Sequence, residues 1–73
     1  MKVVLGEKPA AAKVHVDTPN GRFRLFYRGF KDKSVSWTER GDQLAAKLAL
    51  KQLWAWNEAA TGHGLPAHLQ GVL

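Results

Sequence analysis

Cysteine is absent from this chain of 73 residues. Without a thiol the protein can form no disulfide, no cysteine nucleophile and no zinc site that uses thiolates. This absence agrees with a reducing compartment, and we expect a cytoplasmic protein. Long apolar runs are missing as well. Residues 1–7 contain too short an apolar run for a signal peptide, and no segment approaches the length of a membrane span.

Catalytic motifs are also missing. The three aspartates are scattered along the chain, the serines and threonines have no obvious base, and the few glycines form no phosphate-binding loop. His15, His63 and His68 do not have the spacing of a metal site. We therefore expect a protein that is not an enzyme and that uses no cofactor and no metal.

Acidic residues are scarce relative to basic ones. The chain has 11 Lys and Arg against 6 Asp and Glu, which gives a net charge of +5. The excess is uneven, because seven basic and three acidic residues lie between Lys13 and Arg40. Such a charge favours polyanionic partners, either nucleic acid or the acidic surface of another protein.

Residues 22–28 alternate between two kinds of side chain. In a strand, successive side chains point to opposite faces, so Phe23, Leu25 and Tyr27 are expected to face a core. The opposite face then carries three arginines around an aromatic ring. Guanidinium groups bind carboxylates or phosphates and stack on rings. A solvated polar face is the other interpretation, but such a face has no use for a central phenylalanine.

The dipeptide Asn20-Gly21 predicts a two-residue type I′ hairpin turn. In the resulting register Asp17 lies opposite Arg24, so that acid meets base, and apolar residues meet apolar residues. The other pairs are Val16 with Leu25, Val14 with Tyr27, His15 with Phe26 and Lys13 with Arg28. On this basis we predict a partner-binding face made of Lys13, His15, Arg22, Arg24, Phe26 and Arg28.

A third strand is expected over residues 34–38, with Val35 and Trp37 on the core face opposite Tyr27 and Leu25. The apolar residues near the N-terminus are expected either to add a short fourth strand, to dock loosely, or to pair with a partner as an edge strand. These residues are Val3, Val4 and Leu5.

One long helix is expected between Thr38, as N-cap, and Gly62, where it stops. Leu50 and Trp54 lie near the edge of its polar stripe, beyond what one sheet can cover. Their cover is expected to come from the folded-back tail or from a partner, and a dimer seam through the same two residues is a further alternative. The core arc of the helix is predicted to hold Leu44, Ala45, Leu48, Ala49, Leu53 and Trp56.

These elements predict an α+β fold in which three, possibly four, antiparallel strands pack on one C-terminal helix. Residues 1–62 are expected to form a single β-β-β-α domain and residues 63–73 a flexible tail. We expect a monomer that is complete from its initiator Met1.

Several nucleic-acid-binding modules share the β-β-β-α order, including plant-type and integrase-type DNA-binding domains. The double-stranded RNA-binding domain shares it too, but carries a glycine and lysine signature at the start of its last helix. Here Glu39 and Asp42 stand where phosphate-binding lysines belong. A small domain that binds DNA or RNA with its basic sheet face remains the alternative function.

Across its whole length the chain resembles the small transcription regulators that lytic phages, in particular phages of Xanthomonas, encode to bind the RNA polymerase of their bacterial host. The similarity lies in the length, the basic sheet and helix, and the loose C-terminal tail; no motif assigns contact residues. It implies binding to the two large polymerase subunits near the RNA exit channel, in the host cytoplasm. The implied consequences are displacement of σ, inhibition of initiation and antitermination.

Overall fold

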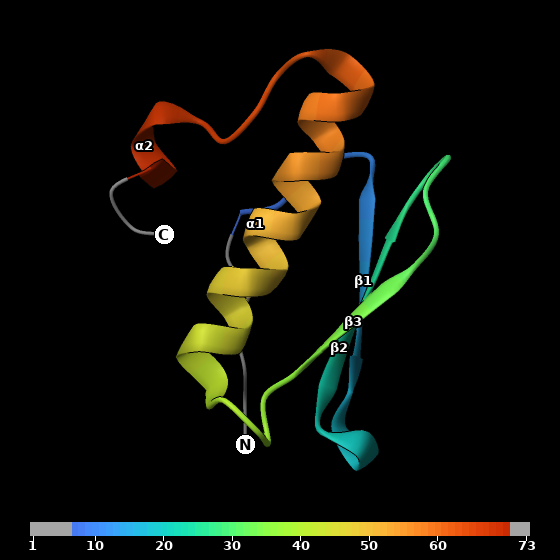
Figure 1. Ribbon diagram of the computed structural model, residues 1–73, viewed down its shortest axis with the longest axis vertical. Helices are drawn as coiled ribbons and strands as arrows, with labels where there is room; N and C mark the ends of the chain where they lie inside the picture. Colours follow the sequence, from blue (N-terminus) through green and yellow to red (C-terminus); the bar gives the residue numbers. More distant parts are fainter. Residues whose placement is uncertain (1–6, 71–73) are drawn as a thin grey trace.

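A computed structural model describes residues 7–70 and shows a three-stranded antiparallel sheet beside one long helix (Figure 1). The α+β architecture with a C-terminal helix is therefore confirmed. The predicted contribution of Val3, Val4 and Leu5 lies outside the described residues. The elements are β1 (Ala12–Asp17), the 3-10 turn η1 (Thr18–Asn20), β2 (Arg22–Tyr27), β3 (Lys33–Ser36), α1 (Asp42–Thr61) and the short α2 (Ala67–Gln70).

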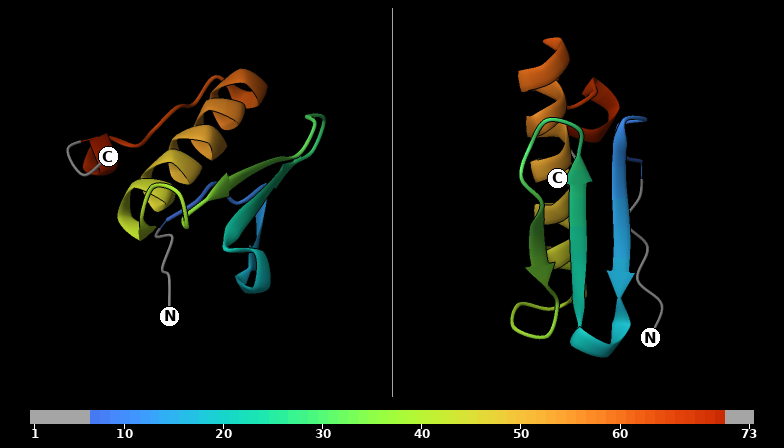
Figure 2. Two further views of the ribbon diagram at one scale, coloured as in Figure 1. Left: turned by 60° about the horizontal axis from the view of Figure 1, so that its bottom comes forward. Right: turned by 90° about the vertical axis from the view of Figure 1, so that its right-hand side faces the viewer.

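The sheet and α1 form two layers. Strand order is β1-β2-β3, so β2 is the central strand and pairs with both neighbours. Helix α1 packs over β2 and β3 on one face of the sheet. The opposite face is covered by no segment among residues 7–70, as the right-hand view of Figure 2 shows. We call these the inner face, which contacts α1, and the outer face.

Large side chains of β2 fill the core between the layers. Phe23 and Leu25 are fully buried, and so is Leu53 of α1. Burying one such side chain stabilises the fold by roughly 1.5–3 kcal/mol. The rings of Phe23 and Trp37 meet edge to face, with centroids 5.0 Å apart. Small residues allow α1 to approach the strands closely; these are Ala12, Ala45 and Ala49.

The predicted two-residue turn at Asn20-Gly21 is wrong. A type I′ turn needs positive φ at both positions, and only Gly21 has it, with φ of 63°. A 3-10 turn that starts at Thr18, with Pro19 as its second residue, is present instead, and the loop has four residues, 18–21. The register is displaced by two residues, so that Asp17 lies opposite Arg22. A displacement by two leaves every side chain on its predicted face. The other observed pairs are Ala12 with Tyr27, Lys13 with Phe26, Val14 with Leu25, His15 with Arg24 and Val16 with Phe23.

The third strand is also displaced from its predicted register. Val35 lies opposite Phe23, four residues from the predicted partner Tyr27. Trp37 lies beyond the end of β3, where its backbone N–H donates a 2.9 Å hydrogen bond to the carbonyl of Gly21. Its ring packs on Phe23 from this position. The displacement is again even, so Val35 and Trp37 still face the core.

Helix α1 begins later than predicted. Its N-cap is Gly41, with φ of 83°, and not Thr38, whose hydroxyl shares a 2.9 Å hydrogen bond with that of Ser36. The predicted stop is confirmed. Gly62 adopts the left-handed conformation, with φ of 85°, and its N–H donates to the carbonyl of Glu58 at 2.8 Å.

The buried arc of α1 is rotated from the predicted one. Leu44 and Leu48 were expected in the core, but 49% and 38% of their surface is exposed. Leu50 is buried, with 5% exposed, which contradicts its predicted role in a partner or dimer contact. Trp54 is half-buried, and its indole N–H donates to the carbonyl of Glu7 at 3.3 Å. The arc shifts because α1 lies over β2 and β3 and leaves β1 at the edge. The predicted core residues Ala45, Ala49, Leu53 and Trp56 are confirmed.

Residues 63–70, predicted as a tail, lie beside the N-terminal end of the described chain. A ring nitrogen of His68 in α2 is 2.7 Å from the carboxylate of Glu7. The amide of Asn57 donates to the carbonyl of His63 at 2.8 Å. Leu65 and Leu69 are half-buried. Trp54 and α2 therefore both contact Glu7, so cover for this side of α1 comes from the chain itself.

Candidate functional site

The outer face is the candidate site. Alternation along β2 buries Phe23, Leu25 and Tyr27 on the inner face and leaves Arg22, Arg24 and Phe26 half-buried on the outer face. The predicted separation of apolar and cationic side chains is confirmed. The outer face consists of Lys13, His15 and Asp17 from β1, Arg22, Arg24 and Phe26 from β2, and Ser34 and Ser36 from β3, with Arg28 directly after β2.

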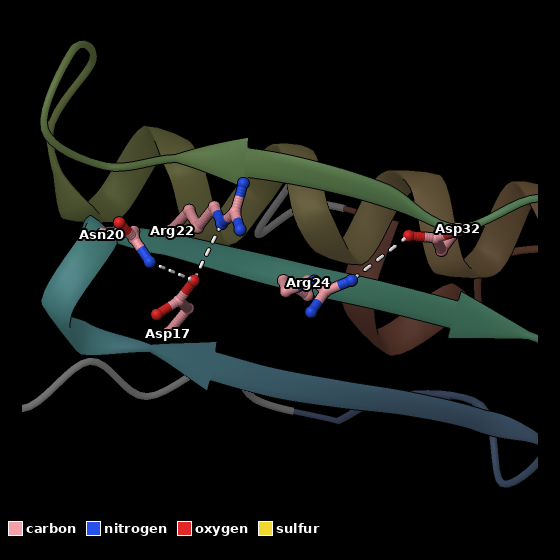
Figure 3. A network of polar contacts seen from close by, with 5 residues as sticks. All are labelled: Asp17, Asn20, Arg22, Arg24 and Asp32. Carbon is pink, nitrogen blue, oxygen red and sulfur yellow. Dashed lines mark hydrogen bonds and ion pairs between the residues drawn. The ribbon is translucent and has the colours of Figure 1, made fainter.

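One end of the outer face is a closed polar network (Figure 3). One carboxylate oxygen of Asp17 accepts hydrogen bonds from the side-chain amide of Asn20 and from Nε of Arg22, both at 2.9 Å. The bond from Asn20, followed by that from Arg22, lowers the pKa of Asp17 below its usual value of 3.8. Asp17 is thus ionised at neutral pH and neutralises Arg22. This register explains why Arg22, and not Arg24, is its partner.

Arg24, in the middle of the outer face, has two looser contacts. A terminal nitrogen lies 3.7 Å from a carboxylate oxygen of Asp32, and both side chains are well exposed to solvent. Its guanidinium carbon lies 5.4 Å from the centre of the Phe26 ring, a cation–π distance. Exposed ion pairs contribute little, since water and salt screen them. An incoming anion can therefore replace Asp32 at low free-energy cost.

The other end of the outer face is hollowed and cationic. An open depression of about 630 Å³ lies where β2 ends and the connection to β3 begins. Within residues 7–70, the side chains of Lys13, Arg28 and Lys31 form no hydrogen bond or ion pair, and all three are exposed. We call this depression the cationic hollow. It is lined by Ala11, Lys13, Phe26, Tyr27, Arg28, Phe30, Lys31 and Asp32.

The structure therefore brings the six predicted cationic and aromatic residues together, from Lys13 to Arg28, on one face. It places Trp54 on α1, away from that face, and Leu50 in the interior. Sequence reasoning missed Phe30, Lys31 and Asp32, because they belong to a connection whose path depends on the register. Phe30 stands four residues after Phe26, and its ring packs on Trp56 with centroids 5.8 Å apart.

A second exposed feature was also missed. Leu44 and Leu48 share one side of α1, and the side chain of Val16 on the edge strand β1 is 45% exposed. Helical spacing groups the two leucines, but it does not say which arc the sheet covers. No contact among the described residues covers them fully.

Neither a search for metal sites and membrane-spanning helices nor a comparison with known proteins assigns a further function. Residues 7–70 contain no cluster of three or more His, Asp or Glu side chains that could hold a metal ion. In the same residues, no helix combines the length and apolar character needed to cross a bilayer. Comparison with known proteins found no family model, no curated protein and no solved structure that matches this chain.

Proposed function

We propose that this protein is a non-enzymatic, phage-encoded regulator that binds bacterial RNA polymerase through its outer face, in the cytoplasm of the host. The observation that carries the proposal is the uncovered outer face itself. On this face and in the adjoining connection, five cationic side chains surround Phe26 against only two carboxylates, Asp17 and Asp32. Such a face complements an acidic protein surface. Polymerase as the partner is supported by the whole-chain resemblance to regulators of lytic phages.

Binding alone accounts for the proposed effects. A protein that occupies the two large subunits near the RNA exit channel needs complementary area to displace σ, and no active site. Specific interfaces bury about 800 Å² on each partner, which is a sizeable share of so small a domain. The outer face lies on a sheet held by the buried inner face, so its backbone loses little conformational freedom on binding. Displacement of σ blocks initiation, while occupancy at the exit channel favours antitermination.

The test is capture of purified Xanthomonas RNA polymerase, as core enzyme and as σ-holoenzyme, on the tagged protein. We expect the wild-type chain to retain the large subunits and to reduce σ in the captured holoenzyme. Arg24→Glu/Arg28→Glu reverses two outer-face charges and is expected to lower capture at least tenfold. Lys47→Glu/Lys51→Glu makes the same change in net charge on the exposed side of α1 and is expected to leave capture within about twofold.

Two results would overturn the proposal. If the wild-type chain captures neither the core enzyme nor the σ-holoenzyme, RNA polymerase is excluded as the partner. Equal loss in the two charge-reversed variants excludes the outer face, because net charge would then explain binding. Thermal unfolding of each variant checks that the fold is intact, and transcription from a σ-dependent promoter followed by a terminator measures initiation and read-through.

A further inference from the structure

We infer that the cationic hollow binds a single strand of nucleic acid, with a base stacked on Phe26 and the backbone phosphates held by Lys13, Arg28 and Lys31. This activity goes beyond polymerase binding and does not depend on it. It belongs to one end of the outer face and requires only this chain.

Phe26 provides the stacking surface. Its ring lies on the solvent side of the central strand, directly opposite Lys13 of β1. An aromatic ring in that position has no core to fill, since the inner face holds Phe23, Leu25 and Tyr27. Exposed aromatic rings on basic sheets stack with unpaired bases, whatever the sequence, because every base has a π-face. The guanidinium of Arg24, 5.4 Å from the ring centre, offers a second group on which a base can stack.

Three cations in the hollow are available for phosphates. Lys13, Arg28 and Lys31 come from β1, from the residue after β2 and from the following connection, so they surround the hollow from different segments. Among the described residues none of the three has a carboxylate partner, whereas Arg22 and Arg24 are paired with Asp17 and Asp32. On the outer face and in the adjoining connection, the cations that no described carboxylate pairs with are thus gathered at this end. Phosphate contacts of this kind position a strand without reading its sequence.

The combination of ring and cations favours a single strand over other polyanions. In a duplex the faces of the bases are covered by their neighbours and cannot reach Phe26. An acidic peptide would neutralise Lys13 and Arg28 but would leave the half-buried ring of Phe26 and the exposed part of Phe30 without a matching group. The hollow is open rather than enclosed, which suits a strand that enters and leaves.

The experiment measures fluorescence anisotropy of a labelled oligouridylate of eight nucleotides, with the full chain and no polymerase. We expect saturable binding. The logarithm of the association constant should fall linearly with the logarithm of the salt concentration, with a slope of about −2, as three phosphate contacts to a single strand predict. Lys13→Gln/Arg28→Gln is expected to weaken binding about tenfold at low salt and to flatten the slope. The matched control, Lys47→Gln/Lys51→Gln, removes the same charge from α1 and is expected to change affinity by less than about twofold.

Phe26→Leu tests the stacking step separately. It keeps an apolar side chain and the net charge but removes the π-face, so we expect about tenfold weaker binding with an unchanged salt slope. Thermal unfolding controls for loss of the fold.

The proposal is overturned if the α1 control weakens binding as much as the hollow variant, because binding would then be diffuse. It is also overturned if Phe26→Leu binds as tightly as the wild type, or if poly-glutamate or a duplex of the same length competes equally well. Capture of nuclease-treated polymerase is a separate measurement. Its success beside failed oligonucleotide binding removes this inference alone, and the reverse outcome removes the polymerase proposal alone.

Discussion

The two faces of β2 come from the same six residues but differ in burial and in the kind of side chain they carry. Phe23, Leu25 and Tyr27 are buried against α1, while the residues between them are half-buried and cationic or aromatic. A strand of six residues thus serves both the core and the candidate site, because successive side chains point to opposite faces. Neighbouring residues of β2 therefore serve different purposes, so substitutions can change stability and binding separately.

The faces also differ in the forces that hold them. The inner face is held by close packing, which is lost when any large side chain is shortened. The outer face is held by exposed ion pairs such as Arg24 with Asp32, at 3.7 Å, which contribute little to stability. This difference leaves the outer side chains free to exchange their intramolecular partners for those of a ligand. Four substitutions test this difference between the two faces.

Phe23→Ala is expected to have the largest effect. Phe23 is fully buried at the centre of the inner face, and such truncations lower the free energy of unfolding by about 3–5 kcal/mol. Small domains have about 5–15 kcal/mol in total, so urea unfolding should show a large loss. Leu44→Ala on the exposed side of α1 is the control, with an expected change within about 0.5 kcal/mol. Equal losses in the two variants would contradict the assignment of the inner face.

Gly21→Ala, compared with Gly29→Ala, tests the turn that sets the register. Both glycines have positive φ, of 63° and 89°, so each alanine costs about 1–2 kcal/mol for the left-handed conformation. A Cβ at Gly21 would also collide with Cγ2 of Thr38, whereas a Cβ at Gly29 meets nothing within 4 Å. We expect Gly21→Ala to be the more destabilising by at least about 1 kcal/mol in urea unfolding. Identical losses would show that the turn is not packed against Thr38.

Tyr27→Phe examines the hydrogen bond between the inner face and α1 that involves a core residue. The hydroxyl of Tyr27 donates a 2.8 Å hydrogen bond to the side-chain carbonyl of Asn57. Its removal is expected to lower the free energy of unfolding by about 0.5–1.5 kcal/mol. A double-mutant cycle with Asn57→Ala isolates this bond, since Asn57 also binds His63. Strict additivity in the cycle would mean that the bond contributes nothing.

Asp17→Asn is expected to have the smallest effect, since the Arg22 and Asn20 groups that donate to Asp17 lie on the solvent side of the sheet, where such pairs contribute little. The pKa of Asp17 is lowered in the folded protein, so the carboxylate stabilises the fold above its usual pKa of 3.8 and loses this effect as the pH falls through the folded value. The variant should unfold at slightly lower urea than wild type at pH 7. The difference should begin to shrink as the pH falls below 3.8, where the unfolded chain takes up a proton, and should disappear below the lowered folded pKa, where the wild-type carboxyl is protonated in both states. A difference that grows on acidification would contradict the network.

Some features were predictable because they depend only on neighbours along the chain. Alternation in residues 22–27 assigned the two faces, and Gly62 marked the end of α1, since both signals are local. The gathering of Lys13, His15 and the three arginines followed from the same alternation. These predictions hold although the predicted registers of β1 and β3 were wrong. The displacements are by two and by four residues, and an even displacement keeps every side chain on the same face of the sheet.

Local patterns in the chain are therefore enough to predict which side chains share a face, where the positive charge collects and where the helix ends. The register, the start and rotation of α1, and hence which cations are neutralised, follow from the packing of distant segments. Pairing Asp17 with Arg22 depends on the four-residue loop, and that loop depends on Trp37 packing over Gly21 and Phe23. The exposure of Leu44 depends on how α1 lies across β2 and β3, whereas Leu50 is buried outside the core cluster between these layers. Such choices are set by free energies of contact between distant residues, which no local pattern contains.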